Sequence, residues 1–154
     1  MRFYILAPEV GGGFGPNTDL DSTCHPPKVG RVHYLFDGWL GDCLAESFPC
    51  FVATESVIAE LKEMEISGMN DSDVEISTSE RFRELYPNVD IGRWRWLRAV
   101  GIPGEDDIAI TASARLVASE RAVAILRRHG LAHCELEEYH REDDERGWNS
   151  PADY

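Results

Sequence analysis

Two stretches of the chain, 65 positions apart, repeat the same order of apolar and polar residues. Residues 51–55 read Phe-Val-Ala-Thr-Glu, and residues 116–120 read Leu-Val-Ala-Ser-Glu. In each stretch three apolar residues indicate a short strand. The hydroxyl residue that follows, Thr54 or Ser119, favours a helix N-cap, and the next glutamate suits the positive end of the helix dipole. The pattern therefore predicts that a strand passes into a helix at both places.

Apolar residues at helical spacing follow each of these caps. They are Val57, Ile58, Leu61 and Met64 in the first stretch and Ala122, Val123, Ala124 and Leu126 in the second. Gly68 and Gly130 mark the ends of the two helices, which are predicted over residues 55–64 and 120–128. Residues 74–76 and 133–139 alternate in the manner of returning strands. We expect the two similar strand-helix-strand units to pack on a shared, mixed sheet.

The rest of the chain supplies shorter elements. Residues 2–7 and 31–36 are rich in aromatic and branched residues and predict strands. Residues 9–30 hold five Gly and three Pro without periodicity, which predicts a long loop. A short helix is expected after Ser79 and before Pro87, and a compact acidic turn over residues 105–107. These elements predict one compact α+β domain over residues 1–140, followed by an acidic tail, residues 141–154, that we expect to be disordered.

Residues 93–98, Arg-Trp-Arg-Trp-Leu-Arg, alternate basic and aromatic side chains with the period of a strand. Exposed, such a strand would stack on single-stranded nucleic acid. Buried, it would place Trp94 and Trp96 in the core and let the arginines meet acidic neighbours. We favour the core strand, in which Trp94 and Trp96 are structural, and expect Trp39 to be structural as well.

Charge narrows the choice of partner. The chain has 28 Asp and Glu against 15 Lys and Arg, a formal net charge of −13 at pH 7. A mostly negative surface argues against a nucleic-acid-binding protein, because phosphate contacts need cations. No apolar run exceeds five residues, which argues against a membrane segment and a signal peptide. We therefore expect a cytoplasmic protein.

The four cysteines, Cys24, Cys43, Cys50 and Cys134, match no zinc or redox spacing and are expected to be free thiols. Cys24 and His25 lie near His33 in sequence, and whether the three bind a metal is left open. We predict no metal and no cofactor for the chain.

Several motifs resemble a group of bacterial proteins. Residues 36–42 (Phe-Asp-Gly-Trp-Leu-Gly-Asp) and 116–122 (Leu-Val-Ala-Ser-Glu-Arg-Ala) carry the most specific similarity, with 48–52, 82–87, 96–97 and 104–108 between them. In this order, over residues 31–139, they resemble the immunity proteins of polymorphic toxin systems, including relatives of the Myxococcus double-CXXCG proteins. This chain contains no Cys-x-x-Cys-Gly motif, so a zinc role is not carried over.

The resemblance implies a protein inhibitor that binds one cognate toxin and blocks its active site or substrate channel, with no catalytic residue of its own. The acidic composition agrees, since a negative domain can pair with the basic cleft of a toxin. The candidate contacts are Glu105, Asp106 and Asp107 on a predicted turn, Glu60 and Glu63 on the first helix, and Trp39 or Trp148 as an aromatic anchor.

Two other functions stay open. A metal-dependent enzyme would gather Asp37, Asp42, Asp106 and Asp107 around a divalent cation, or use Cys24 and His33 as nucleophile and base. No nucleophile motif or phosphate loop supports this reading, so we do not expect an enzyme. A small regulatory or scaffold domain with a non-toxin partner is the other alternative.

Overall fold

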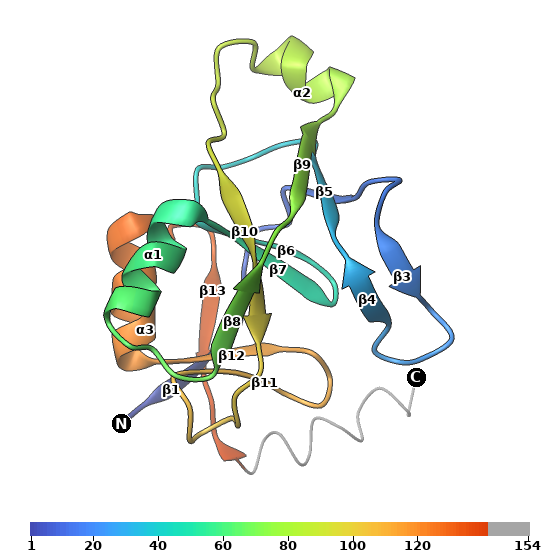
Figure 1. The fold of residues 1–154 in the computed structure, drawn as a ribbon. Coiled ribbons are helices and arrows are strands. Elements are labelled where there is room, and N and C mark those ends of the chain that lie inside the picture. The colour runs from blue at the N-terminus through green and yellow to red at the C-terminus, as the bar shows by residue number, and fades with distance from the viewer. Residues whose placement is uncertain (142–154) are drawn as a thin grey trace.

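The computed structural model describes residues 1–141, which form three helices and thirteen strands (Figure 1). The helices are α1 (Glu55–Glu63), α2 (Glu80–Leu85) and α3 (Glu120–His129). The strands are β1 (Phe3–Ala7), β2 (Gly12–Phe14), β3 (Asp19–Asp21), β4 (Lys28–Arg31), β5 (His33–Phe36), β6 (Leu44–Ser47), β7 (Cys50–Thr54), β8 (Met69–Ser72), β9 (Glu75–Thr78), β10 (Trp94–Ala99), β11 (Ile108–Ile110), β12 (Leu116–Ser119) and β13 (Glu135–Glu138). The α+β class is confirmed.

Two four-stranded sheets dominate the molecule and share one plan. Their strand orders are β6-β7-β10-β8 and β11-β12-β1-β13. In each sheet a hairpin, β6–β7 or β11–β12, is followed by a helix and a returning strand, so the two units are β7-α1-β8 and β12-α3-β13. The central strand, β10 or β1, is antiparallel to both of its neighbours. The two predicted strand-helix-strand units are therefore present, but the expectation that they share one sheet is wrong.

The central strands are exchanged between the two halves. β1 precedes the first unit along the chain and lies in the sheet of the second, whereas β10 precedes the second unit and lies in the sheet of the first. Their registers match, because Phe3 lies opposite Ser119 and Trp94 lies opposite Thr54. Even the first helical N–H groups have equivalent partners. Glu55 N–H donates to the Arg93 carbonyl at 2.9 Å, and Glu120 N–H donates to the Arg2 carbonyl at 3.0 Å.

The exchanged strands also join the sheets at equivalent places. Beyond β1, Glu9 forms a parallel bridge with Ala45 of β6, and beyond β10, Gly101 forms a parallel bridge with Ala109 of β11. The fold is thus a structural repeat whose halves hold each other's central strand. Sequence reasoning found the strand-cap-helix stretch of each half but not the exchange, because the residues of β1 and β10 do not resemble each other.

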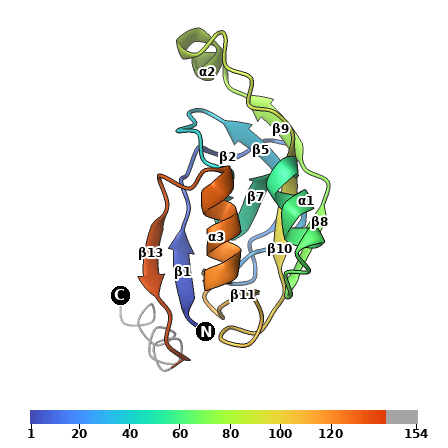
Figure 2. The ribbon, with the colours of Figure 1, turned by 90° about the vertical axis from the view of Figure 1, so that its left-hand side faces the viewer.

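Helices α1 and α3 lie side by side over the two sheets (Figures 1 and 2). Their apolar faces, with those of β7, β12 and the hairpins, form the largest core cluster, in which Leu61, Leu116 and Leu126 are 0% exposed. Burial of this kind is the main stabilising contribution in a domain of this size. None of the helices described in residues 1–141 is long and apolar enough to cross a membrane.

A second core lies between the β10 sheet and a three-stranded sheet ordered β2-β5-β9. Trp94 and Trp96 are buried in it, at 5% and 8% exposure, and Arg95 on the other face of β10 forms ion pairs with Asp71 at 2.7 Å and with Asp73. The prediction of a structural core strand is therefore confirmed. From this sheet an arm carrying α2 extends away from the two large sheets (Figure 2).

Three local predictions need correction. Residues 9–30, expected to form a loop, contain β2 and the β3–β4 hairpin. These strands are only three or four residues long, too short to show a clear alternation, and β2 and β4 contain glycine. Gly12 allows the close approach to β5, since a Cβ there would lie 1.8 Å from the Leu35 carbonyl oxygen. The returning strand of the first unit is β8, whereas residues 74–76 belong largely to β9, in the three-stranded sheet. Thr54 stands at the N-cap of α1, but its side chain makes no capping hydrogen bond.

The acidic tail and Trp148 lie beyond the described residues, apart from Arg141 itself.

Candidate functional site

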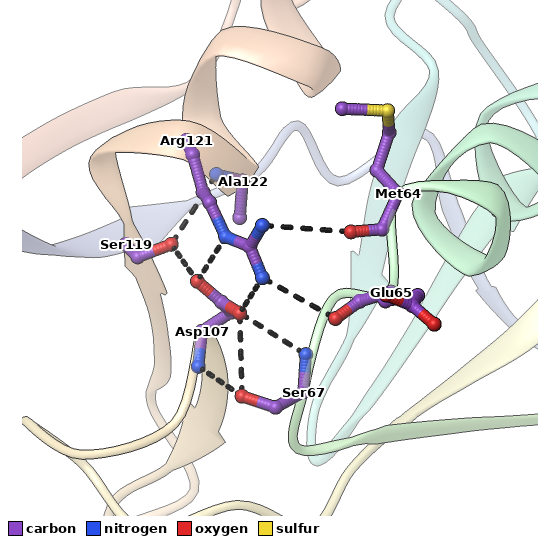
Figure 3. A network of polar contacts seen from close by, with 7 residues as sticks. All are labelled: Met64, Glu65, Ser67, Asp107, Ser119, Arg121 and Ala122. Carbon is purple, nitrogen blue, oxygen red and sulfur yellow. Dashed lines mark hydrogen bonds and ion pairs between the residues drawn. The ribbon is translucent and has the colours of Figure 1, made fainter.

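Asp107, a candidate partner-binding residue, is the buried centre of a partly exposed polar network (Figure 3). It is only 7% exposed. Its Oδ1 accepts hydrogen bonds from Ser119 Oγ at 2.7 Å and Arg121 Nε at 3.0 Å. Its Oδ2 accepts from Arg121 Nη2 at 2.7 Å and Ser67 N–H at 3.1 Å. A partner contact needs an exposed side chain, so the prediction of Asp107 as a contact residue on the turn does not agree with its burial.

The network connects three separate parts of the chain. Arg121, in the first turn of α3, also donates to the Glu65 carbonyl at 3.2 Å, just after α1. The Arg121 guanidinium, followed by the hydroxyl of Ser119 and the N–H of Ser67, holds the pKa of the Asp107 carboxyl well below its usual range. Asp107 therefore fastens the start of β11 to the α1–β8 loop and to α3, and its role is structural.

The two neighbours of Asp107 differ from it. Glu105 is exposed and forms an ion pair with Arg141 at 3.3 Å. Asp106 is half-buried and accepts a hydrogen bond from Ile102 N–H at 2.7 Å, which closes the turn. Of the three carboxylates, Glu105 is the one most open to a partner.

The two candidate contacts on α1, Glu60 and Glu63, also differ in their surroundings. Glu60 of α1 pairs with Arg128 and lies 3.3 Å from His129 Nε2, both on α3. The hydrogen bond from Arg128 is the main reason that the pKa of Glu60 is lowered. Glu63, one turn nearer the end of α1, is exposed. Glu60 thus helps to hold the two helices together, and Glu63 remains a candidate contact.

Trp39 is half-buried. Its indole N–H donates to the Asp42 carbonyl at 2.8 Å, and its ring lies edge-on to Trp94 with centroids 5.9 Å apart. Both contacts are internal, which agrees with the structural role expected for Trp39 and leaves little of the ring for a partner.

The four aspartates of the alternative metal enzyme do not come together. Asp37 is exposed and accepts a hydrogen bond from Ser79 Oγ at 2.7 Å, Asp106 closes its own turn, and Asp107 belongs to the Arg121 network. His33 is buried with its Nε2 2.8 Å from Ser77 Oγ, and within residues 1–141 it forms no hydrogen bond with Cys24, whose Sγ lies 4.0 Å from Thr23 Oγ1. Neither proposed catalytic arrangement is formed.

Asp42 instead lies with two residues that sequence reasoning missed, Glu9 and His133. One donor atom from each of the three lies within 4.8 Å of the others, and within the described chain this is the one such group of three or more His, Cys, Asp or Glu. We call it the Glu9 corner. No sequence motif predicts this corner, because its three residues are far apart in the chain. Glu9 follows β1, Asp42 precedes β6 and His133 precedes β13.

The fold repeats this corner with different residues. Gly101 is the counterpart of Glu9, because Gly101 forms a parallel bridge with Ala109 of β11 as Glu9 does with Ala45 of β6. Asp106 precedes β11 by two residues, as Asp42 precedes β6, and Gly68 matches His133 at the spacing of 65 that relates α1 to α3. In this Gly101 corner the backbone fills the space, since a Cβ on Gly101 would lie 2.5 Å from the Asp106 Cβ and 2.2 Å from the Ile108 carbonyl oxygen.

Comparison of the sequence with protein-family profiles finds no match. Comparison with curated proteins finds none either.

Proposed function

We propose that this protein is an immunity protein that binds a cognate bacterial toxin with a basic surface and blocks its active site or substrate channel. The motif resemblance over residues 31–139 suggests the class. The structural observation that carries the proposal is the surplus of exposed carboxylates, because half of the 14 Lys and Arg residues within residues 1–141 already pair with the protein's own carboxylates.

Seven cations of the described chain form ion pairs with its own carboxylates: Lys62, Arg81, Arg95, Arg115, Arg121, Arg128 and Arg141. Exposed carboxylates without such a cation include Glu55, Glu63, Glu65, Glu80, Glu84, Asp90, Glu120, Glu135 and Glu138. An excess of this kind produces a negative field that draws a basic partner and raises its association rate.

The α2 arm offers an apolar centre within this field. Leu85, Tyr86 and Val89 are 58%, 42% and 45% exposed, and Glu84 and Asp90 flank them. A groove of about 520 Å³ between α2 and β2 continues the surface past Leu85 and Tyr86. Exposed apolar side chains rimmed by charges are typical of protein interfaces, where aromatic residues contribute much of the binding energy. The arm is therefore the part of the surface best suited to enter a cleft.

The test is co-expression of the tagged full-length chain with the polypeptide encoded by the adjacent gene, followed by purification and a growth-rescue assay. We expect a complex that protects the host, and an association rate that falls roughly tenfold or more between low and high salt. Capture of a non-toxin partner without any rescue would favour the regulatory or scaffold alternative instead.

A paired variant locates the interface. Leu85→Asp with Tyr86→Ala should weaken rescue strongly, because it removes the exposed apolar centre of the arm. The Tyr86 ring also lies 5.3 Å from the ring of buried Phe82, so the fold of the variant is checked by circular dichroism. Met64→Asp is the matched control, since Met64 is 49% exposed at the end of α1, away from the arm. Full rescue by the folded arm variant would move the interface to another acidic surface, with Glu63 and Glu105 the next candidates.

A further inference from the structure

The Glu9 corner places three metal-binding side chains together from three distant parts of the chain. Glu9 follows β1, Asp42 precedes β6 and His133 precedes β13, and their donor atoms lie within 4.8 Å of one another. Two carboxylates and one imidazole at this separation can reach one metal ion after small side-chain rotations, because metal–ligand bonds to these groups are about 2.0–2.2 Å.

Glu9 is the independent sign that a ligand belongs there. The residue is 7% exposed, and its Oε1 accepts a hydrogen bond from Leu40 N–H at 3.1 Å. Its Oε2 is buried and has no hydrogen-bond partner within residues 1–141. A buried carboxylate oxygen without a partner is costly, and native proteins rarely retain one without a ligand, an ion or a bound water beside it.

Asp42 and His133 are held in place for binding. Asp42 is 2% exposed, and its two oxygens accept hydrogen bonds from Ala132 N–H at 2.9 Å and His133 N–H at 2.8 Å. The His133 Nδ1 lies 3.2 Å from Asp42 Oδ1, and the His133 side chain is 44% exposed. The site is therefore fixed on its inner side and open to water through His133, which provides an entry path.

The buried carboxylates of Asp42 and Glu9 also favour a bound cation, because no lysine or arginine pairs with them within residues 1–141. Elsewhere in the fold a buried aspartate, Asp107, is compensated by the guanidinium of Arg121 at 2.7 Å. The position that matches Arg121 in the first half is Ser56, which carries no charge. Asp42 is accompanied instead by a second buried carboxylate, Glu9, and by a histidine.

We propose that Glu9, Asp42 and His133 form a binding site for a divalent transition-metal cation of the kind represented by Zn²⁺ and Mn²⁺. The imidazole favours such ions over Ca²⁺ and Mg²⁺, which prefer oxygen ligands alone. The bound ion joins β1, the turn before β6 and the α3–β13 loop, and with three protein ligands it keeps an open coordination position toward solvent.

The experiment uses the full chain, stripped of metal with a chelator and titrated separately with Zn²⁺, Mn²⁺ and Ca²⁺ in a calorimeter. We expect one Zn²⁺ or Mn²⁺ per chain and much weaker Ca²⁺ binding. Glu9→Gln and His133→Asn should each weaken binding at least tenfold. The matched controls Glu138→Gln and His140→Asn change exposed residues outside the corner and should bind as the unmodified chain does.

Mn²⁺ serves as a second readout, because it binds thiols poorly and broadens the NMR signals of nearby residues. The amide signals of residues 9, 42 and 133 should broaden first. The proposal is overturned if the folded chain binds neither ion, if either corner variant binds like the controls, or if the broadening centres elsewhere. His133→Asn keeps the test decisive even if Glu9→Gln fails to fold, since His133 is half-exposed.

Discussion

The Glu9 corner and the Gly101 corner occupy equivalent positions in the two halves of one repeat, yet their contents are opposite. In the first, Glu9, Asp42 and His133 bring donor atoms together. In the second, Gly101 and Gly68 approach so closely that a Cβ on Gly68 would lie 2.0 Å from the Ile108 carbonyl oxygen. The same backbone frame thus brings three potential ligand side chains together in one half, whereas in the other it packs two glycines against the backbone and the Cβ of Asp106.

The difference places a stabilising polar network in one half and a group of potential ligands in the other. In the second half the carboxylate of Asp107, next to the glycine corner, is satisfied by Arg121, Ser119 and Ser67. In the first half the residue that matches Asp107 is Cys43, whose thiol donates only to the Leu126 carbonyl at 3.4 Å. In the second half, therefore, the polar network around Asp107 connects the elements. In the first half, the Glu9 carboxylate keeps a buried oxygen without a hydrogen-bond partner within residues 1–141.

The largest expected effect comes from breaking the Asp107 network. Asp107→Asn removes the charge that balances Arg121 and weakens one buried and several part-buried hydrogen bonds, so the free energy of unfolding should fall by about 2–4 kcal/mol. The value lies below that of a fully buried pair, because the Arg121 side chain is 48% exposed and can be rehydrated. Denaturant unfolding measures it, and Asp37→Asn, an exposed aspartate, is the control.

Acid gives a second measurement of the same network. The pKa of Asp107 is depressed in the folded state, so its contribution is present above its unfolded pKa of about 3.9 and is lost as the pH falls toward the folded value. The stability of the unmodified chain should fall more steeply below pH 4 than that of Asp107→Asn. Parallel acid limbs for the two proteins would contradict the role assigned to Asp107.

A somewhat smaller effect should follow from a methyl group in the Gly101 corner. Gly101→Ala places a Cβ against the Ile108 carbonyl oxygen and the Asp106 Cβ, and overpacking of this kind costs about 1–3 kcal/mol. Gly38→Ala is the control, because a Cβ on Gly38 would meet nothing within 4 Å. Equal stability of the two variants would show that the corner has room for side chains, and the contrast with the Glu9 corner would then disappear.

Much of the repeat could be predicted from the sequence, because its signals are local. The strand-to-helix transitions at Thr54 and Ser119, the helical spacing of apolar residues and the alternation around Trp94 and Trp96 all depend on neighbours along the chain. The strand exchange is invisible there, since the pairing of β1 with β12 and of β10 with β7 is decided by contacts across the fold.

The candidate site residues also depend on contacts across the fold that neighbours along the chain do not reveal. The acidic run of residues 105–107 looks uniform in sequence, but one member is exposed, one closes a turn and one is buried. What separates them is the position of Arg121, which lies on a helix 14 residues further on. Glu9 and His133 carried no signal at all, because a single acid after a strand and a single histidine before one are common in any chain.

The smallest expected difference concerns the two helix caps, which are equivalent in sequence but differ in structure. Ser119 Oγ accepts a hydrogen bond from Ala122 N–H at 3.3 Å and donates to Asp107 Oδ1 at 2.7 Å, and the residue is 0% exposed. Thr54 makes no capping hydrogen bond, and its hydroxyl lies 3.4 Å from Ser56 Oγ. Ser119→Ala should therefore cost about 1–2 kcal/mol, whereas Thr54→Ala should stay within about 0.5 kcal/mol of the unmodified chain. Thermal or denaturant unfolding of both variants under one set of conditions measures the difference. An equal loss in the two would mean that Thr54 caps α1 as Ser119 caps α3, and that the halves are more alike at their helix starts than at their corners.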